Sequence, residues 1–189
     1  SGTIEITGNP RCGTILQHFG LFPWKTVAQN IGLGLQLKNQ PESLIREKTE
    51  DLVKELGLSG FADHFPGQLS GGMQQRVALA RTLAIDPQIL FMDEPLSSLD
   101  ALTRERLQNL IAEVWISKKI TLVLVTHSIE EAVVLGQQII VLSDRPGKIL
   151  RIVYNPEAGN PEYRNRKNFF HQCTELRRIL KGEQNGQEA

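Results

Sequence analysis

Cysteines, long apolar runs and a surplus of one charge are all scarce in this sequence. Only two cysteines occur, Cys12 and Cys173, at a spacing that fits no metal site, so unpaired thiols in a reducing compartment are favoured over a disulfide framework. The longest apolar stretches, near 120–125 and 139–142, are too short to cross a bilayer, and no signal peptide opens the chain. We therefore expect a soluble intracellular protein that reaches a membrane only through a partner.

A net charge is missing as well. Lys plus Arg and Asp plus Glu both number 21, so the formal net charge is zero. Nothing in that balance points to nucleic acid as a partner, whereas protein partners stay open. Apolar residues make up 40% of the 189 residues, which suits one ordinary globular domain with its own core.

The residues that are present predict an α/β fold. Apolar runs at 88–92 and 121–126 lack alternation, as expected of strands buried on both faces. Further strands are expected at 1–8, 13–17, 138–142 and 148–153. Helical patterns at 104–116 and 128–135 lie between strands, and this alternation predicts a mostly parallel sheet with helical crossovers.

A helical block interrupts the strands, and its main helices are expected at 43–56 and 72–85. A last helix is expected at 165–181. Its apolar face carries Phe169, Cys173, Leu176 and Leu180. These patterns predict four segments in the order N-terminal strands, helical subdomain, α/β core, and linker with C-terminal helix: 1–26, 27–86, 87–154 and 155–189.

Two acids end the apolar run at 88–92. Asp93 and Glu94 are expected at the carboxyl end of a parallel strand, which is where open α/β sheets bind ligands. One acid there can hold Mg²⁺ through water, and its neighbour can orient or deprotonate an attacking water. A solvated turn or a helix cap explains the same pair equally well.

Three more features are compatible with phosphate chemistry, and each has a plainer explanation. Ser70, Gly71 and Gly72 open a helix, where free N–H groups form an anion site, although a simple N-cap also explains them. His127 follows an apolar run and can reach a phosphate oxygen, but a lone histidine there is often structural. Gln17 ends a strand and can bind water or a cation, as can many surface glutamines.

In their order along the chain, these residues resemble the motifs of the ABC-type ATPases. The stretch 69–75 is similar to the family's signature motif, 90–94 to its Walker B strand and 97–100 to its D-loop. His127 resembles the switch histidine and Gln17 the Q-loop glutamine. The resemblance reaches to about residue 153.

Within that family, the aromatic loop at 21–24 and the turn at 143–148 are most similar to the nitrate, sulfonate and taurine importers. Ser128 departs from the family, which often has Asp after the histidine. The resemblance implies an ATPase subunit that binds ATP and Mg²⁺, pairs with a second ATPase subunit, and sits under permease subunits on the inner face of the membrane.

The resemblance also implies roles for single residues. Glu94 is implied to polarise the attacking water, and His127 to position it with the γ-phosphate. Asp93 and Gln17 are implied to organise Mg²⁺, and Gln17 to sense the γ-phosphate as well. The residues implied to bind the partner's ATP or to lie at the dimer seam are Ser70, Gly71, Gly72, Gln75 and Asp100.

No Gly-x-x-x-x-Gly-Lys-Ser/Thr stretch occurs in the sequence. Lys25 and Thr26 follow Pro23 and Trp24, which cannot form the glycine-lined nest of N–H groups that cradles phosphates. We therefore expect a truncated P-loop NTPase core whose phosphate cradle lies upstream, and a chain that is inactive alone. Loss of a parallel strand would also expose apolar surface on its neighbours.

Three hypotheses stay open. The chain is a shortened ATPase subunit, a degenerate subunit that lends its signature motif to an intact partner, or a remnant that does not fold stably. An upstream glycine loop would favour the first, and ATP binding that needs a partner would favour the second.

Overall fold

The computed structural model describes residues 8–182, so the strand expected at 1–8 lies almost wholly outside the described residues. The strands are β1 (Cys12–Ile15), β2 (Ile89–Asp93), β3 (Thr121–Val125), β4 (Gln138–Leu142) and β5 (Ile149–Tyr154). The α-helices are α1 (Val27–Leu37), α2 (Glu42–Glu55), α3 (Gly71–Leu83), α4 (Ala101–Lys118), α5 (Ile129–Leu135) and α6 (Lys167–Leu180). Between 8 and 182, each strand and helix expected from the sequence is present within a few residues of its expected bounds.

Strands β1, β2 and β3 form a parallel sheet in that order, which confirms the α/β class. Ile15 pairs with Met92, and Met92 pairs with Leu124. The connections run through helices, as parallel strands require. Because the strands are parallel and in register, their carboxyl ends meet at one edge of the sheet.

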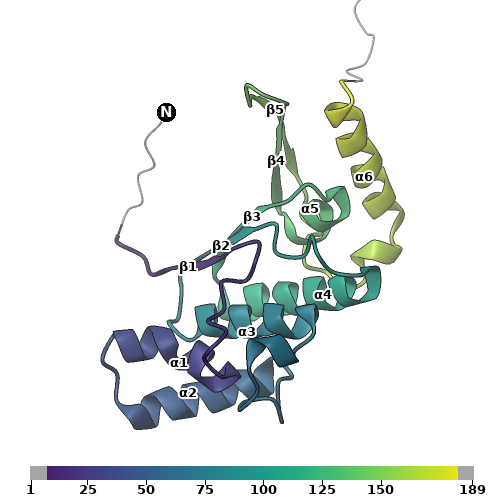
Figure 1. Cartoon of the computed structure of the whole chain (residues 1–189). Coiled ribbons are helices and arrows are strands. Elements are labelled where there is room, and N and C mark those ends of the chain that lie inside the picture. The colour runs from purple at the N-terminus through teal and green to yellow at the C-terminus, as the bar shows by residue number, and fades with distance from the viewer. Residues whose placement is uncertain (1–7, 183–189) are drawn as a thin grey trace, which may run out of the picture.

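Among the described residues, helices cover one face of this sheet. Leu90 and Met92 are 1% exposed on the face toward α3 and α4, which lie on one side of the strands in Figure 1. Strand β1 approaches α3 so closely that a Cβ on Gly13 would lie 2.2 Å from Thr82 Cγ2, so this position requires glycine. This face of the sheet therefore packs directly on α3, the helix that begins within the signature-like stretch 69–75.

The opposite face of the sheet is open, and the prediction that β2 and β3 are buried on both faces is wrong. Burial alternates along both strands, and Val123 and Val125 of β3 are 41% and 58% exposed. Strand β3 pairs with no strand other than β2 within residues 8–182. Both apolar runs form strands as predicted, but no described element covers the second face of the sheet that they form.

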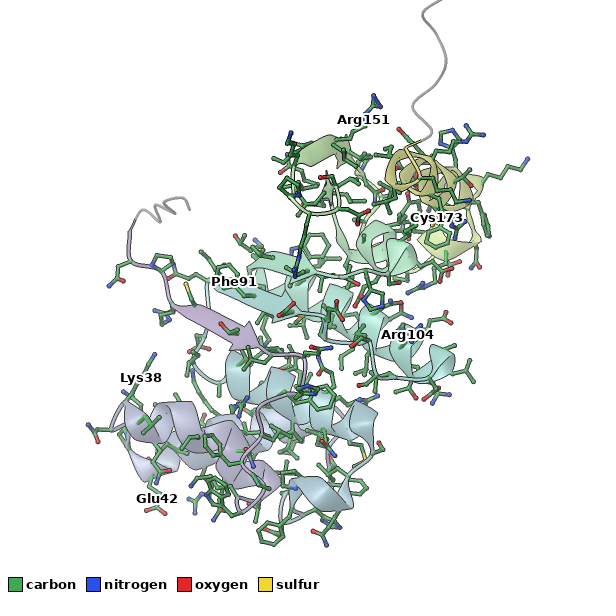
Figure 2. The ribbon with its side chains drawn as sticks, turned by 45° about the horizontal axis from the view of Figure 1, so that its top comes forward. Lys38, Glu42, Phe91, Arg104, Arg151 and Cys173 are labelled. Atoms are coloured by element: carbon green, nitrogen blue, oxygen red, sulfur yellow. The ribbon has the colours of Figure 1, made fainter. Side chains whose placement is uncertain are left out.

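The expectation that β4 joins the parallel sheet is also wrong. Among the described residues it pairs only with β5, as an antiparallel two-stranded sheet. Helix α6 packs beside β4 and α5, and Figure 2 shows Cys173 of α6 in the same upper part of the molecule as Arg151 of β5, away from Lys38 and Glu42 of the helical block. Leu180, expected on the apolar face of α6, is 50% exposed at the end of the helix, and Ile179 of the same turn is buried in its place.

Helices α1, α2 and α3 pack on one another as the helical block. Its interior includes Ile31 and Val77, both fully buried. Helix α1 begins with a capping box, in which Thr26 and Gln29 each bond the other's backbone N–H. No helix between residues 8 and 182 combines the length and apolar character needed to cross a bilayer.

Candidate functional site

The ends of three parallel strands bring the expected catalytic residues to one edge. Gln17 follows β1, Asp93 ends β2, with Glu94 next, and His127 follows β3 by two residues. They come from separate parts of the sequence, and the strand register places them side by side. This is the edge at which open α/β sheets bind ligands.

Glu94 and His127 face each other directly. The distance from His127 Nδ1 to Glu94 Oε1 is 3.2 Å, and the Glu94 side chain is 31% exposed while that of His127 is 70% exposed. A carboxylate beside an imidazole at an open sheet edge can bind and orient a water molecule between acid and base groups. The structure therefore brings together two of the expected catalytic residues.

The backbone of Glu94 is unusual and held on both sides. Its φ is +44°, a left-handed conformation that non-glycine residues adopt at a cost of roughly 1–3 kcal/mol. The Glu94 N–H donates to the carbonyl of Val125 (2.9 Å), and the Ser97 hydroxyl donates to the Glu94 carbonyl (3.1 Å). Residues held in such conformations cluster at functional sites, and here the conformation follows directly from the turn after β2.

Asp93 and Gln17 are both exposed at this edge, so their oxygens face solvent. Across residues 8–182, the structure contains no group of three or more His, Cys, Asp or Glu side chains that would hold a metal ion unaided. A site with one or two protein oxygens suits Mg²⁺, which keeps several waters and takes further ligands from phosphates. Asp93 and Gln17 fit that donor set.

The signature residues form the start of α3. Ser70 is the N-cap, and its hydroxyl accepts from the Met73 N–H (3.3 Å), so the plain capping explanation holds for this side chain. Ser70 and Gly71 are exposed. Gly72 is buried, and a Cβ there would lie 2.6 Å from Thr103 Cγ2 of α4, so this glycine is needed for packing. The exposed turn leaves an anion-binding helix terminus open.

Gln75 is buried between α3 and its neighbours. The side chain is 1% exposed, and neither atom of its amide has a hydrogen-bond partner among the described residues. Gly72, Gln75 and Leu79 share one face of α3, at positions i, i+3 and i+7, and that face is buried. The contact of Gln75 with a nucleotide stays a prediction, and in this structure the helical period turns the side chain inward.

Asp100 caps the next helix. Its carboxylate accepts from the Thr103 N–H (3.0 Å) at the start of α4, and that backbone hydrogen bond lowers the pKa of Asp100. Arg104, which sequence reasoning missed, donates to the carbonyls of Leu96 (3.3 Å) and Leu99 (2.6 Å). The loop between β2 and α4 is thus held from its end by one arginine, a role that no local sequence signal reveals.

A second missed arginine fixes the aromatic loop to α3. Arg81 donates to the carbonyls of Gly20 (2.6 Å) and Phe19 (2.8 Å), and both of those residues have positive φ values, +58° and +61°. Burial lowers the pKa of the Arg81 guanidinium. The helix that begins with the signature residues therefore also holds the loop that begins with Gln17.

Asn30 organises the other half of the aromatic loop. The side chain is fully buried, accepts from the Phe22 N–H (2.9 Å) and donates to the carbonyls of Phe22, Lys25 and Thr26. Trp24 projects from this loop with 70% of its surface exposed. A rigid base thus presents an apolar side chain to solvent.

Several known proteins are similar to this chain. Residues 5–97 match the ABC transporter family. The chain is 45% identical to a taurine import ATP-binding protein of Pelagibacter ubique, over 79% of this chain and 58% of the relative. It is 37% identical to a nitrate import ATP-binding protein of a Synechocystis species, over 96% of this chain and 74% of the relative.

A solved structure also matches, the dimeric post-hydrolysis state of the ATP-binding cassette MJ0796 bound to ADP and Pi. The TM-score is 0.66 at 36% identity, over 77% of this chain and 63% of that chain. This chain belongs to the ATP-binding protein family of ABC transporters. It spans 58% of the length of the taurine relative, so it corresponds to only part of such a protein.

Proposed function

We propose that this chain carries the catalytic edge of an ATP-hydrolysing subunit that powers an importer for a small anion such as nitrate, a sulfonate or taurine. The observation that carries the proposal is the approach of Glu94 and His127 to 3.2 Å at the ends of neighbouring parallel strands. The class of solute is inferred from the similarity of this chain to import proteins for taurine and for nitrate.

The proposed roles follow from position. Glu94 polarises the attacking water, and His127 orients that water and the γ-phosphate. Asp93 and Gln17 supply oxygens to Mg²⁺, which neutralises charge on the phosphates when bound. Asp100 lies at the seam with a second subunit.

The phosphate cradle comes from outside these 189 residues, either from further residues of the same protein or from another chain. The edge of β3, which has no partner strand among residues 8–182, and the exposed Val123 and Val125 support this step. A further parallel strand would pair that edge, and the helix that follows its loop would cover the valines. The phosphate-binding loop that follows such a strand would lie at the carboxyl ends of the strands, beside Glu94 and His127.

The partners are a second ATPase subunit and membrane permease subunits, with the protein at the cytoplasmic face of the membrane. The dimeric state of the ATP-binding cassette MJ0796 supports the first partner. The exposed Trp24, presented by a loop that Asn30 and Arg81 hold, supports a protein contact at the helical subdomain. We propose the domain limits 1–26, 27–86, 87–154 and 155–189 for this arrangement.

The test joins a strand, a Gly-x-x-x-x-Gly-Lys-Ser loop and a helix ahead of residue 1 and measures Mg-ATP turnover. We expect turnover to appear, and Glu94→Gln to abolish it while sparing nucleotide-driven dimerisation. The exposed Glu113→Gln on α4 is the matched control and should leave turnover unchanged. Turnover that survives Glu94→Gln would remove Glu94 from the role of base.

A second candidate is a subunit that hydrolyses nothing itself and lends its signature to an intact partner. The exposed Ser70 and Gly71 at the start of α3 favour it, since they leave the helix terminus open to a partner's phosphate. In that case the 189-residue chain raises ATP turnover by an intact ATP-binding subunit. Gly71→Glu, which places a negative charge at the terminus, should remove the increase, and an increase that survives Gly71→Glu would exclude this candidate.

A further inference from the structure

Glu131 is a buried carboxylate beside the site that the proposed chemistry does not use. It lies in the first turn of α5, and the residue is 2% exposed. Burial is the main cause that raises the pKa of Glu131, against lowering by the Thr126 hydrogen bond, Arg104 and His127. A group that is costly to bury in its charged form needs a structural reason to be there.

That reason is a hydrogen-bonded ring at the start of α5. In an ordinary capping box, the carboxylate at the third helical position accepts from the backbone N–H of the cap residue. Here the Ser128 N–H donates instead to the Thr126 hydroxyl (3.0 Å), and that hydroxyl donates to Glu131 Oε2. The Glu131 N–H donates to the Ser128 hydroxyl (3.3 Å) and closes the ring.

The ring encloses the position of His127. Thr126 and Ser128, the residues before and after it, are both tied to Glu131, while the histidine side chain is 70% exposed. A side chain with so little packing takes its direction mainly from its backbone. Yet Nδ1 of His127 lies 3.2 Å from Glu94 Oε1.

Only one of the two carboxylate oxygens of Glu131 takes part in the ring. Oε1 is buried without a hydrogen-bond partner in the described part of the chain, so only Oε2 is bonded. An unsatisfied buried oxygen destabilises the folded state. A carboxylate serving only as a cap would be better placed in solvent, where both oxygens are satisfied.

We propose that Glu131 is a positioning residue for His127: through Thr126 it holds the backbone on both sides of the histidine and directs the imidazole toward Glu94. The catalytic meaning of this inference rests on the proposed function. The geometric claim does not, because it concerns the chain without nucleotide.

The experiment measures the imidazole signals of His127 by NMR in the full 189-residue chain. The chain has four histidines, and a His127→Gln variant assigns the ring. Glu94→Gln is then introduced as a probe. In the wild-type background we expect a clear shift of the His127 ring signals, because the two side chains lie 3.2 Å apart.

The same probe is then applied in five further backgrounds. Glu131→Ala and Thr126→Val should each abolish the His127 response, and together they should do no more than either alone. Glu131→Gln keeps an acceptor oxygen and should restore the response. Glu130→Gln, an exposed neighbour on α5, is the matched control and should leave it intact.

A thermal melt of each variant shows whether it folds. If Glu131→Ala does not fold, the His127 response in Thr126→Val tests the proposal instead. A His127 response that persists in folded Glu131→Ala and Thr126→Val would overturn the proposal and leave Glu131 as a cap alone. So would an absent response in the wild type, or its loss in Glu130→Gln. Since no nucleotide is present, failure of the ATPase proposal would leave these signals unchanged.

Discussion

The helical block and the strands β3 to β5 use similar apolar residues and differ in what covers them. In the helical block, Ile31 and Val77 are fully buried, and α1 carries a complete capping box. In the strands, Val125, Ile140 and Ile152 are each more than half exposed. The helical block therefore buries its interior side chains by itself, whereas the strands present apolar surface that a further element would bury.

The difference also locates the proposed chemistry. The proposed catalytic pair, Glu94 and His127, lies where the sheet is exposed in the described part of the chain, and the turn at Ser70 lies at the start of a well-packed helix. The residues proposed to bind the nucleotide thus lie at the margin between a buried and an exposed region, which fits the pattern that binding groups are presented by a rigid scaffold.

The largest expected effect is the loss of stability when a buried side chain of the helical block is truncated, compared with truncation of an exposed side chain of β3. Ile31→Ala should lower the free energy of unfolding by about 2–5 kcal/mol, because it leaves a cavity in the helical block. Val125→Ala should change it by no more than about 0.5 kcal/mol, because the side chain is already exposed. Chemical denaturation measures both, and similar losses would show that β3 is covered in solution.

The clamp on the aromatic loop predicts the next effect. Arg81→Gln should cost about 1–3 kcal/mol, since it removes charged hydrogen bonds to two backbone carbonyls. Hydrogen exchange should rise in residues 17–24 and stay unchanged in α2. The exposed Arg106→Gln on α4 serves as control, and unchanged exchange in the loop of the Arg81 variant would contradict the clamp.

The N-cap of α3 predicts a smaller loss. Ser70→Ala should lower stability by about 1 kcal/mol, because the Met73 N–H loses its acceptor. Thermal melts compare it with Ser59→Ala, a change at an exposed position outside the helices. Equal melting temperatures for the two variants would mean that Ser70 contributes to ligand binding alone.

The pH dependence of stability is expected to show the smallest effect. Burial raises the pKa of Glu131 above its ordinary value of 4.5, so the folded state binds a proton more tightly than the unfolded state. The resulting stabilisation is complete below about pH 4.5 and is lost as the pH rises through the raised pKa. The melting temperature of wild type minus that of Glu131→Gln should therefore fall across this window, and a rising difference would contradict the assignment.

The sequence predicted the element order and the gathering of Gln17, Asp93, Glu94 and His127 at one edge, because strand ends and parallel pairing follow from apolar patterns. It could not predict which strand faces are covered, since apolar runs look alike whether one face or both are buried. The isolation of β4 from the parallel sheet was missed for the same reason.

Residues that act through long-range contacts gave no local signal. Arg81 reaches Phe19 and Gly20 across more than sixty residues, with separations of 62 and 61. Gln75 was assigned from its motif, and only the helical phase of α3 shows that the side chain turns into the core. Glu131 is a partial exception, because a Ser followed three residues later by Glu is the sequence pattern of a capping box.

The most direct test of the account is Mg-ATP binding to the purified 189-residue chain, followed by isothermal titration calorimetry beside a circular-dichroism melt. We expect a cooperative melt and no heat of binding, because these 189 residues carry the proposed catalytic edge without a phosphate cradle. Binding in the micromolar range by the chain alone would contradict it and would mean that a phosphate site exists elsewhere in these residues.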